Sequence, residues 1–207
     1  MTVDIRIGNR YFRCMAKGID SREKTLAAAA KLFRQQGYHG TALQEILRAG
    51  GSPRGSLYFH FPNGKEEIGE AALALAGEDV RRAIARAAET SESAEIFLTR
   101  IARGMFANLE KSDYTEGCPI ATTALETAAQ SEILGAATRN AFQKWEHEIS
   151  RGLERFGIGA SDAEELATSV LSLLEGALLL ARTYRSSAPM FRAEKALKLL
   201  LGATRSE

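Results

Sequence analysis

Apolar residues recur every three or four positions along most of this chain, and no segment alternates apolar and polar residues as a strand would. This pattern predicts an all-α fold. Glycine, proline and capping residues place the helix ends. We expect helices at about 20–37, 41–50, 52–61, 64–88, 94–110, 119–128, 132–156, 161–186 and 191–203.

The segment between residues 41 and 61 has the pattern of two short helices joined by a tight turn. Thr41 is expected to cap the first helix, with Gln44 three residues later completing a capping box. The glycine pair 50–51 ends this helix and allows a sharp turn. Ser52 then caps the second helix, and Pro53 suits its first position, where no amide donor is needed. This arrangement predicts a helix-turn-helix.

The second helix of this hairpin exposes residues suited to reading DNA. In a helix-turn-helix the first turn of the second helix meets base edges in the major groove. Arg54 can donate twice to guanine, Gly55 lets the backbone approach closely, and Ser56 can donate to a base or phosphate. Tyr58 and His60 lie further along, where sugar and phosphate contacts fix the register. The alternative is that such a hairpin serves only to pack the core.

Three segments resemble the TetR family of bacterial regulators: LFRQQGYHGT at 32–41, EILRAGGSPRGSLYFHF at 45–61 and KEEI at 65–68. The connection that follows, F-P-x-G-K at 61–65, is one residue longer than the common form of the family. This longer form is similar to that of the LmrA/YxaF-like subgroup. Gly50 stands where the family usually has alanine, which should loosen the end of its helix. The resemblance implies that Arg22 meets a phosphate, and Lys65 opens a helix whose amides and cation can hold another.

The predicted DNA-binding residues are therefore Arg22, Thr41, Ser52, Pro53, Arg54, Gly55, Ser56, Tyr58, His60 and Lys65. They fall in a predicted three-helix DNA-binding domain at 20–67, which is followed by a helical effector-binding and dimerisation domain at 68–207. Residues 1–19 are interpreted as a mobile N-terminal tail, with a basic arm that touches DNA as the alternative. Met15 leaves open a later start of translation.

Charge is distributed unevenly along the 207 residues, although the net charge is only +1. Residues 1–67 carry eleven Lys and Arg against six Asp and Glu, a net charge of +5, while the remainder carries 16 against 20, a net charge of −4. A basic N-terminal third fits one end that faces DNA. Chance clustering is the alternative, because the excess is modest.

Nothing in the composition points to secretion or to a membrane. The two cysteines, Cys14 and Cys118, lack the spacing of a zinc site or a disulfide framework. No N-terminal run resembles a signal peptide. The longest apolar stretch, 166–181, contains Glu175 and is too short to span a bilayer. We therefore expect a cytoplasmic protein without a membrane partner.

The helices at 162–186 and 191–203 have more apolar residues than one face can hold, which predicts a homodimer; a fully intramolecular bundle is the alternative. Similarity to the LmrA/YxaF-like subgroup at 117–120 and beyond implies a small apolar or aromatic effector. Helical bundles offer sites for such ligands, but plain core residues show the same pattern. The candidate lining residues are Phe97, Ile101, Met105, Phe106, Cys118, Phe142, Trp145 and Leu178.

Catalysis is not expected. His39, His60 and His147 have no histidine partner four residues away, and no phosphate-binding loop, dinucleotide fingerprint or nucleophile elbow occurs. We expect no metal and no cofactor. The sequence predicts a repressor that binds a palindromic operator as a homodimer and is released by an effector. Two alternatives remain: a DNA-binding regulator without an effector, and a helical small-molecule-binding protein with a vestigial hairpin.

Overall fold

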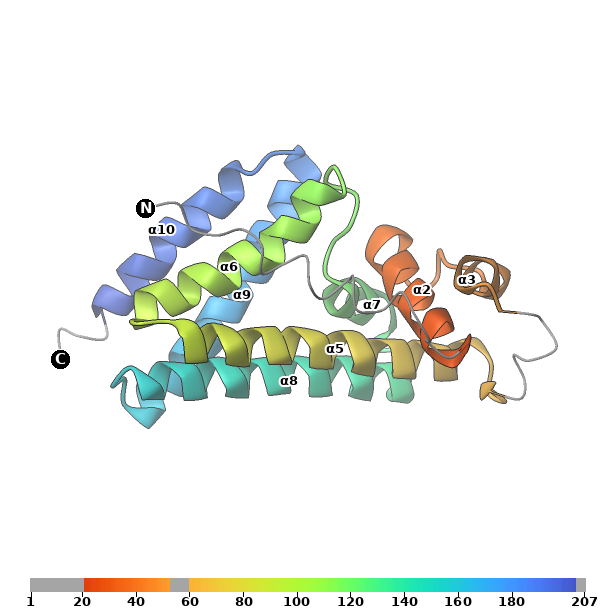
Figure 1. Cartoon of the computed structure of the whole chain (residues 1–207), viewed down its shortest axis with the longest axis horizontal. Helices are drawn as coiled ribbons and strands as arrows, with labels where there is room; N and C mark the ends of the chain where they lie inside the picture. Colours follow the sequence, from red (N-terminus) through yellow and green to blue (C-terminus); the bar gives the residue numbers. More distant parts are fainter. Residues whose placement is uncertain (1–20, 53–59, 204–207) are drawn as a thin grey trace.

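The computed structural model describes residues 21–52 and 60–203. Within these ranges the chain is helical and has no strand, as the sequence predicts. Figure 1 shows a short arm of helices at one end of a larger bundle. The helices are α2 (Ser21–Gln36), α3 (Leu43–Gly50), α5 (Lys65–Thr90), α6 (Ala94–Lys111), α7 (Pro119–Thr127), α8 (Glu132–Arg155), α9 (Ala160–Tyr184) and α10 (Ala188–Ala203).

We call α2 and α3 the head. Phe33 and Ile46 are fully buried between these helices, in a core that continues to Phe61 just before α5. Helix α3 packs closely on α2 at Gly50: a methyl group there would lie 2.9 Å from the Cα of Thr25. Glycine at this position therefore allows close packing of α3 on α2, a physical reason for the departure from alanine.

Helices α5 and α8 run side by side in the same direction and form the long base of the molecule (Figure 1). Small residues face each other along this pair: a Cβ on Gly77 would lie 3.0 Å from that of Ala141. Arg81 of α5 donates to Glu148 of α8 at 2.6 Å. Helix α5 begins beside the head and ends far from it, so it connects the two parts of the molecule (Figure 1).

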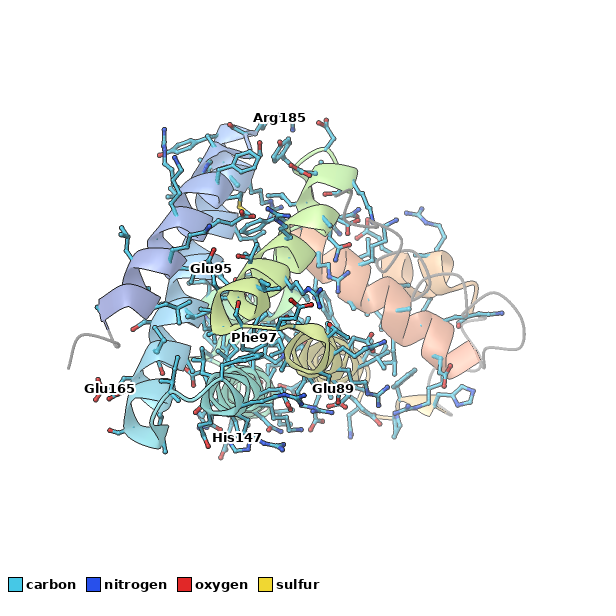
Figure 2. The ribbon with its side chains drawn as sticks, turned by 60° about the vertical axis from the view of Figure 1, so that its left-hand side comes forward. Glu89, Glu95, Phe97, His147, Glu165 and Arg185 are labelled. Carbon is cyan, nitrogen blue, oxygen red and sulfur yellow. The ribbon has the colours of Figure 1, made fainter. Side chains whose placement is uncertain are left out.

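We call α6 to α10 the body. Viewed nearly along α5 and α8, α9 and α10 stand on one side of this pair and α2 on the other (Figure 2). Phe97 of α6 points inward, with its ring against Gly152 of α8. Ion pairs from Lys198 to Glu95 at 2.7 Å, and from Arg103 to Glu194 of α10, fasten α10 to α6.

Three predicted helix starts are wrong. The N-cap of α3 is Ala42, whose amide donates to Glu45 at 3.0 Å, so Thr41 is not the cap. The N-cap of α9 is Gly159, and Ser161 already lies inside the helix. Helix α10 begins at Ala188 and not at 191, so Pro189 lies in its first turn, where the missing amide costs no hydrogen bond.

Candidate nucleic-acid interface

The predicted reading surface lies between the end of α3 and the start of α5. Pro53, Arg54, Gly55, Ser56 and Tyr58 fall outside the described residues, so their predicted roles stay predictions. The residues on either side fix where this segment leaves and rejoins the head. Gly51 ends α3 in the left-handed region with φ of 65°, which is the sharp turn predicted from the glycine pair.

Ser52 lies at the point where the chain leaves the hairpin turn. Its hydroxyl is 2.7 Å from the hydroxyl of Thr25, which is buried in α2. The contact ties the turn to the first helix of the head. His60, at the other end of the segment, is half-buried beside Phe61, with ring centroids 6.4 Å apart.

Arg22 is exposed in the first turn of α2. Its guanidinium lies 5.3 Å from the centre of the Phe61 ring, a cation–π distance. Phe61 is only 1% exposed, so it provides a fixed platform. The charge of Arg22 is thereby held over the Phe61 ring, and its contact with a phosphate stays a prediction.

Lys65 is the first residue of α5, as a phosphate contact at a helix start requires. Its ammonium lies 4.2 Å from the centre of the Tyr38 ring. Partial burial lowers the pKa of Lys65, while the charge of Glu126 opposes that shift. Lys65 is therefore half-buried against the Tyr38 ring, and its contact with a phosphate stays a prediction.

Thr41 does not share this exposure. Its side chain is fully buried, and its hydroxyl donates to the carbonyl oxygen of Gly37 at 2.6 Å. The bond closes the turn between α2 and α3. In this arrangement Thr41 shapes the head, and it presents no group to DNA.

The eight predicted effector-lining residues all belong to the core of the body or pack against it. Phe142 and Trp145 make an edge-to-face pair with centroids 5.5 Å apart, and Phe97 lies 6.0 Å from Phe156. Met105 and Phe142 are half-buried, and the other six are buried. A groove of about 620 Å³ lies elsewhere, between α2, α3 and α6, and none of the eight residues lines it.

Glu175, which the sequence analysis did not assign to the site, lies beside one of these residues. Its carboxyl is next to the Cys118 thiol, and burial raises the pKa of Glu175 to about 7. Its oxygen Oε1 is buried and has no hydrogen-bond partner in the part of the chain that the structure describes; the same holds for the hydroxyl of Thr123 on α7. Burying a polar atom without a hydrogen bond costs free energy.

Sequence reasoning also missed the residues that join the head to the body. Arg182 of α9 donates to the carbonyl oxygen of Gln35 in α2 at 2.7 Å. Glu126 of α7 accepts the amide of His39 at 2.8 Å. A charged residue in the last turn of an apolar helix was the available signal for Arg182, but its target lies 147 positions away in the sequence.

Two family models match this chain, and together they cover both parts of the molecule. The model of bacterial regulatory proteins of the TetR family matches residues 26–72. The model of the C-terminal domain of LmrA/YxaF-like transcriptional regulators matches residues 94–196. The first range covers most of α2 and all of α3, and the second begins at the first residue of α6.

The sequence similarity to individual relatives extends over most of the chain. The regulator LmrA of Bacillus subtilis is 35% identical over 182 residues, which cover 88% of this chain and 97% of LmrA. The repressor DhaR of a Mycobacterium species is 27% identical over 82% of this chain and 86% of DhaR.

Solved structures show the same fold. A TetR regulator from Chloroflexus aurantiacus has a TM-score of 0.72 at 31% identity, over 86% of this chain and 91% of the other. A TetR regulator from Legionella pneumophila has a TM-score of 0.77 at 22% identity, over 88% and 98%.

The fold and the hairpin thus define a transcriptional regulator with a helix-turn-helix head, not an enzyme. The chain belongs to the TetR family, and its body is of the LmrA/YxaF-like kind. The resemblance and the all-α fold expected from the sequence are both confirmed. Among the residues that the structure describes, one helix, α9, is long and apolar enough to cross a membrane by length and composition, a property that it shares with core helices of soluble proteins.

Proposed function

We propose that this TetR-family regulator represses transcription in the bacterial cytoplasm by binding a palindromic operator as a homodimer, and that a small apolar or aromatic effector releases it. The observation that carries the proposal is the match to LmrA along 88% of the chain, through both head and body. The domain boundaries proposed with it remain 20–67 for DNA binding and 68–207 for the effector and the dimer.

DNA binding is supported by the position of the charged residues around the hairpin. Arg22 lies over the ring of Phe61, and Lys65 begins α5, so two cations lie close to the point where the segment that carries Arg54 ends. Phosphate contacts there would fix the register in which the hairpin reads bases.

Dimer formation is supported by apolar side chains that the single chain leaves in solvent. On α9 and α10 five of these are between 45% and 76% exposed: Leu179, Leu180, Tyr184, Phe191 and Leu199. A second copy related by a two-fold axis would bury them. It would also place two heads to read two symmetric half-sites.

The effector proposal rests on the composition of the body. Its core combines aromatic rings with the polar pair of Cys118 and Glu175, so a ligand inserted there would meet apolar walls and one hydrogen-bonding group. Such a ligand acts only if it binds the released conformation more tightly than the DNA-bound one.

Operator selection from random duplex DNA, at two salt concentrations, tests the proposal. We expect a palindrome with half-sites about one helical turn apart, and affinity that falls steeply with salt. The selected operator then serves as the probe in a screen for compounds that release it. Failure of the folded protein to enrich any site would overturn the repressor assignment.

A further inference from the structure

Besides the covalent connection through α5, the head is held by a set of contacts from α7, α9 and the segment before α7. Arg182 is the central residue of this set. It lies in the last turns of α9, the helix with the exposed leucines, yet its Nη2 reaches the carbonyl oxygen of Gln35 at 2.7 Å. One helix thus carries both the proposed dimer surface and a direct bond to the head.

The bond is made where α2 has unsatisfied acceptors. The last four carbonyls of a helix lack intrahelical partners, and a cation there is favoured by the helix dipole. The amide of Gly117 satisfies the preceding carbonyl, that of Arg34, at 3.1 Å. The side chain of Gln35 also donates to Glu116 at 3.0 Å. The body therefore holds the end of α2 at two consecutive carbonyls.

A second contact between the body and the head lies one turn further along the chain. Glu126 of α7 accepts the amide of His39 at 2.8 Å. Its carboxylate packs directly on Gly37, so any side chain there would collide with it. The charge of Glu126 also reaches Lys65, which stacks on Tyr38. Helix α7 therefore fixes the turn after α2, and this contact does not involve Arg182.

We propose that Arg182 and Glu126 are positioning residues that fix the head relative to the dimer axis and thereby set the spacing between half-sites that the protein accepts. The inference rests on the proposed function. A helix such as α5 can bend or tilt at its end, whereas the bond from α9 to α2 and the bond from α7 to the turn after α2 limit how far the head can move. Without them the head would reach half-sites at several separations.

The experiment measures binding of the full-length protein to a series of operators whose two half-sites are moved apart or together one base pair at a time. Arg182→Met keeps the aliphatic part of the side chain but removes its hydrogen-bond donors. Glu126→Ala removes the contact between α7 and the turn after α2. Arg139→Met, at an exposed arginine on α8, is the matched control. A double variant with Arg182→Met and Glu126→Ala tests whether the two contacts contribute additively to the spacing preference.

We expect the wild type and Arg139→Met to prefer one spacing sharply. In Arg182→Met and in Glu126→Ala, the preference for that spacing over its neighbours should fall by about tenfold, the loss of one charge-assisted hydrogen bond. Binding to the best spacing should change less than binding to the others. Arg182→Lys, which keeps a cation at the end of α2, should retain part of the preference.

Two results would overturn the inference while the proposed function stands. One is an unchanged spacing preference in both variants. The other is equal weakening at every spacing, because that would make the two residues ordinary stabilisers of the head. A wild-type protein that binds no palindrome at all would instead overturn the proposed function, and the inference with it. If Arg182→Met does not fold, Glu126→Ala decides alone.

Discussion

The indole nitrogen of Trp145 donates a hydrogen bond to the carbonyl oxygen of Gly77, 2.7 Å away, in the middle of the pair formed by α5 and α8. The glycine leaves room for Ala141 to approach, so the two helix backbones come close enough for the indole to reach. Trp145 is 2% exposed. Trp145 therefore fixes α8 against α5, the helix that begins beside the head.

Replacing Trp145 with phenylalanine should destabilise the protein by about 1–3 kcal/mol, because it removes this bond and leaves a void beside α5. Denaturant unfolding followed by circular dichroism measures the change. The neighbouring Phe142→Leu change, at a half-buried ring, should cost less. Equal costs at both positions would show that the bond to Gly77 contributes nothing of its own.

Gly37→Ala should destabilise the head by about 1–3 kcal/mol. Gly37 has φ of 78°, where alanine is strained, and its side chain would collide with the Glu126 carboxylate. Adding Glu126→Ala should recover the part due to the collision but not the backbone strain. A double-mutant cycle separates the two. Simple additivity of the two changes would contradict the packing of Glu126 on Gly37.

Stability should depend on pH through Glu175. Burial raises the pKa of Glu175 from 4.5 to about 7, while the hydrogen bond with the Cys118 thiol acts to lower it. Between pH 4.5 and 7 the unfolded chain loses this proton and the folded chain keeps it, so stability is lost as pH rises through this window.

The loss should amount to roughly 2 kcal/mol and should be absent in Glu175→Gln, which cannot ionise. Thermal unfolding at pH 5 and at pH 8 measures it. Glu165→Gln, at an exposed position of the same helix, is the control and should behave as the wild type (Figure 2). A parallel pH dependence in wild type and Glu175→Gln would assign the effect to other groups.

Arg54→Ala should weaken operator binding by about 1–3 kcal/mol and relax the choice of base at one position of each half-site, if this arginine donates to guanine. Competition binding against operators with single substitutions is the measurement. Equal weakening on all sequences, including random DNA, would instead identify Arg54 as a phosphate contact.

Leu180→Glu should raise the dimer dissociation constant by at least about a hundredfold, because the two-fold axis would bring two carboxylates into one apolar contact. Sedimentation at several concentrations reports the dimer. Leu125→Glu is the matched control, since Leu125 is 84% exposed but lies on α7. A dimer that persists in Leu180→Glu would place the interface elsewhere.

Local pattern was sufficient for most of the fold. The helical spacing of Phe97, Ile101 and Leu109, which are buried in α6, identifies that helix without tertiary information. The glycines at 37 and 51 mark two turns correctly because a left-handed residue is a local requirement. The hairpin and its family could be recognised for the same reason: their residues lie close together in the sequence.

Helix starts were predicted less well where several residues can serve as the cap. Thr41 and Ser161 have the right side chains, but the chain uses Ala42 and Gly159 instead. Thr41 is drawn into the core, where its hydroxyl bonds to Gly37. Propensity ranks residues for a cap, whereas packing decides which of them is available.

The sequence by itself therefore determined the helical class, the helix-turn-helix and the family, because each depends on residues within a few turns of one another. Only the tertiary structure decided that Arg182 reaches Gln35, that Glu126 holds His39, and that Glu175 meets Cys118. These pairs join helices far apart in the chain. Their partners follow from how the helices pack, and no local pattern in one sequence contains that information.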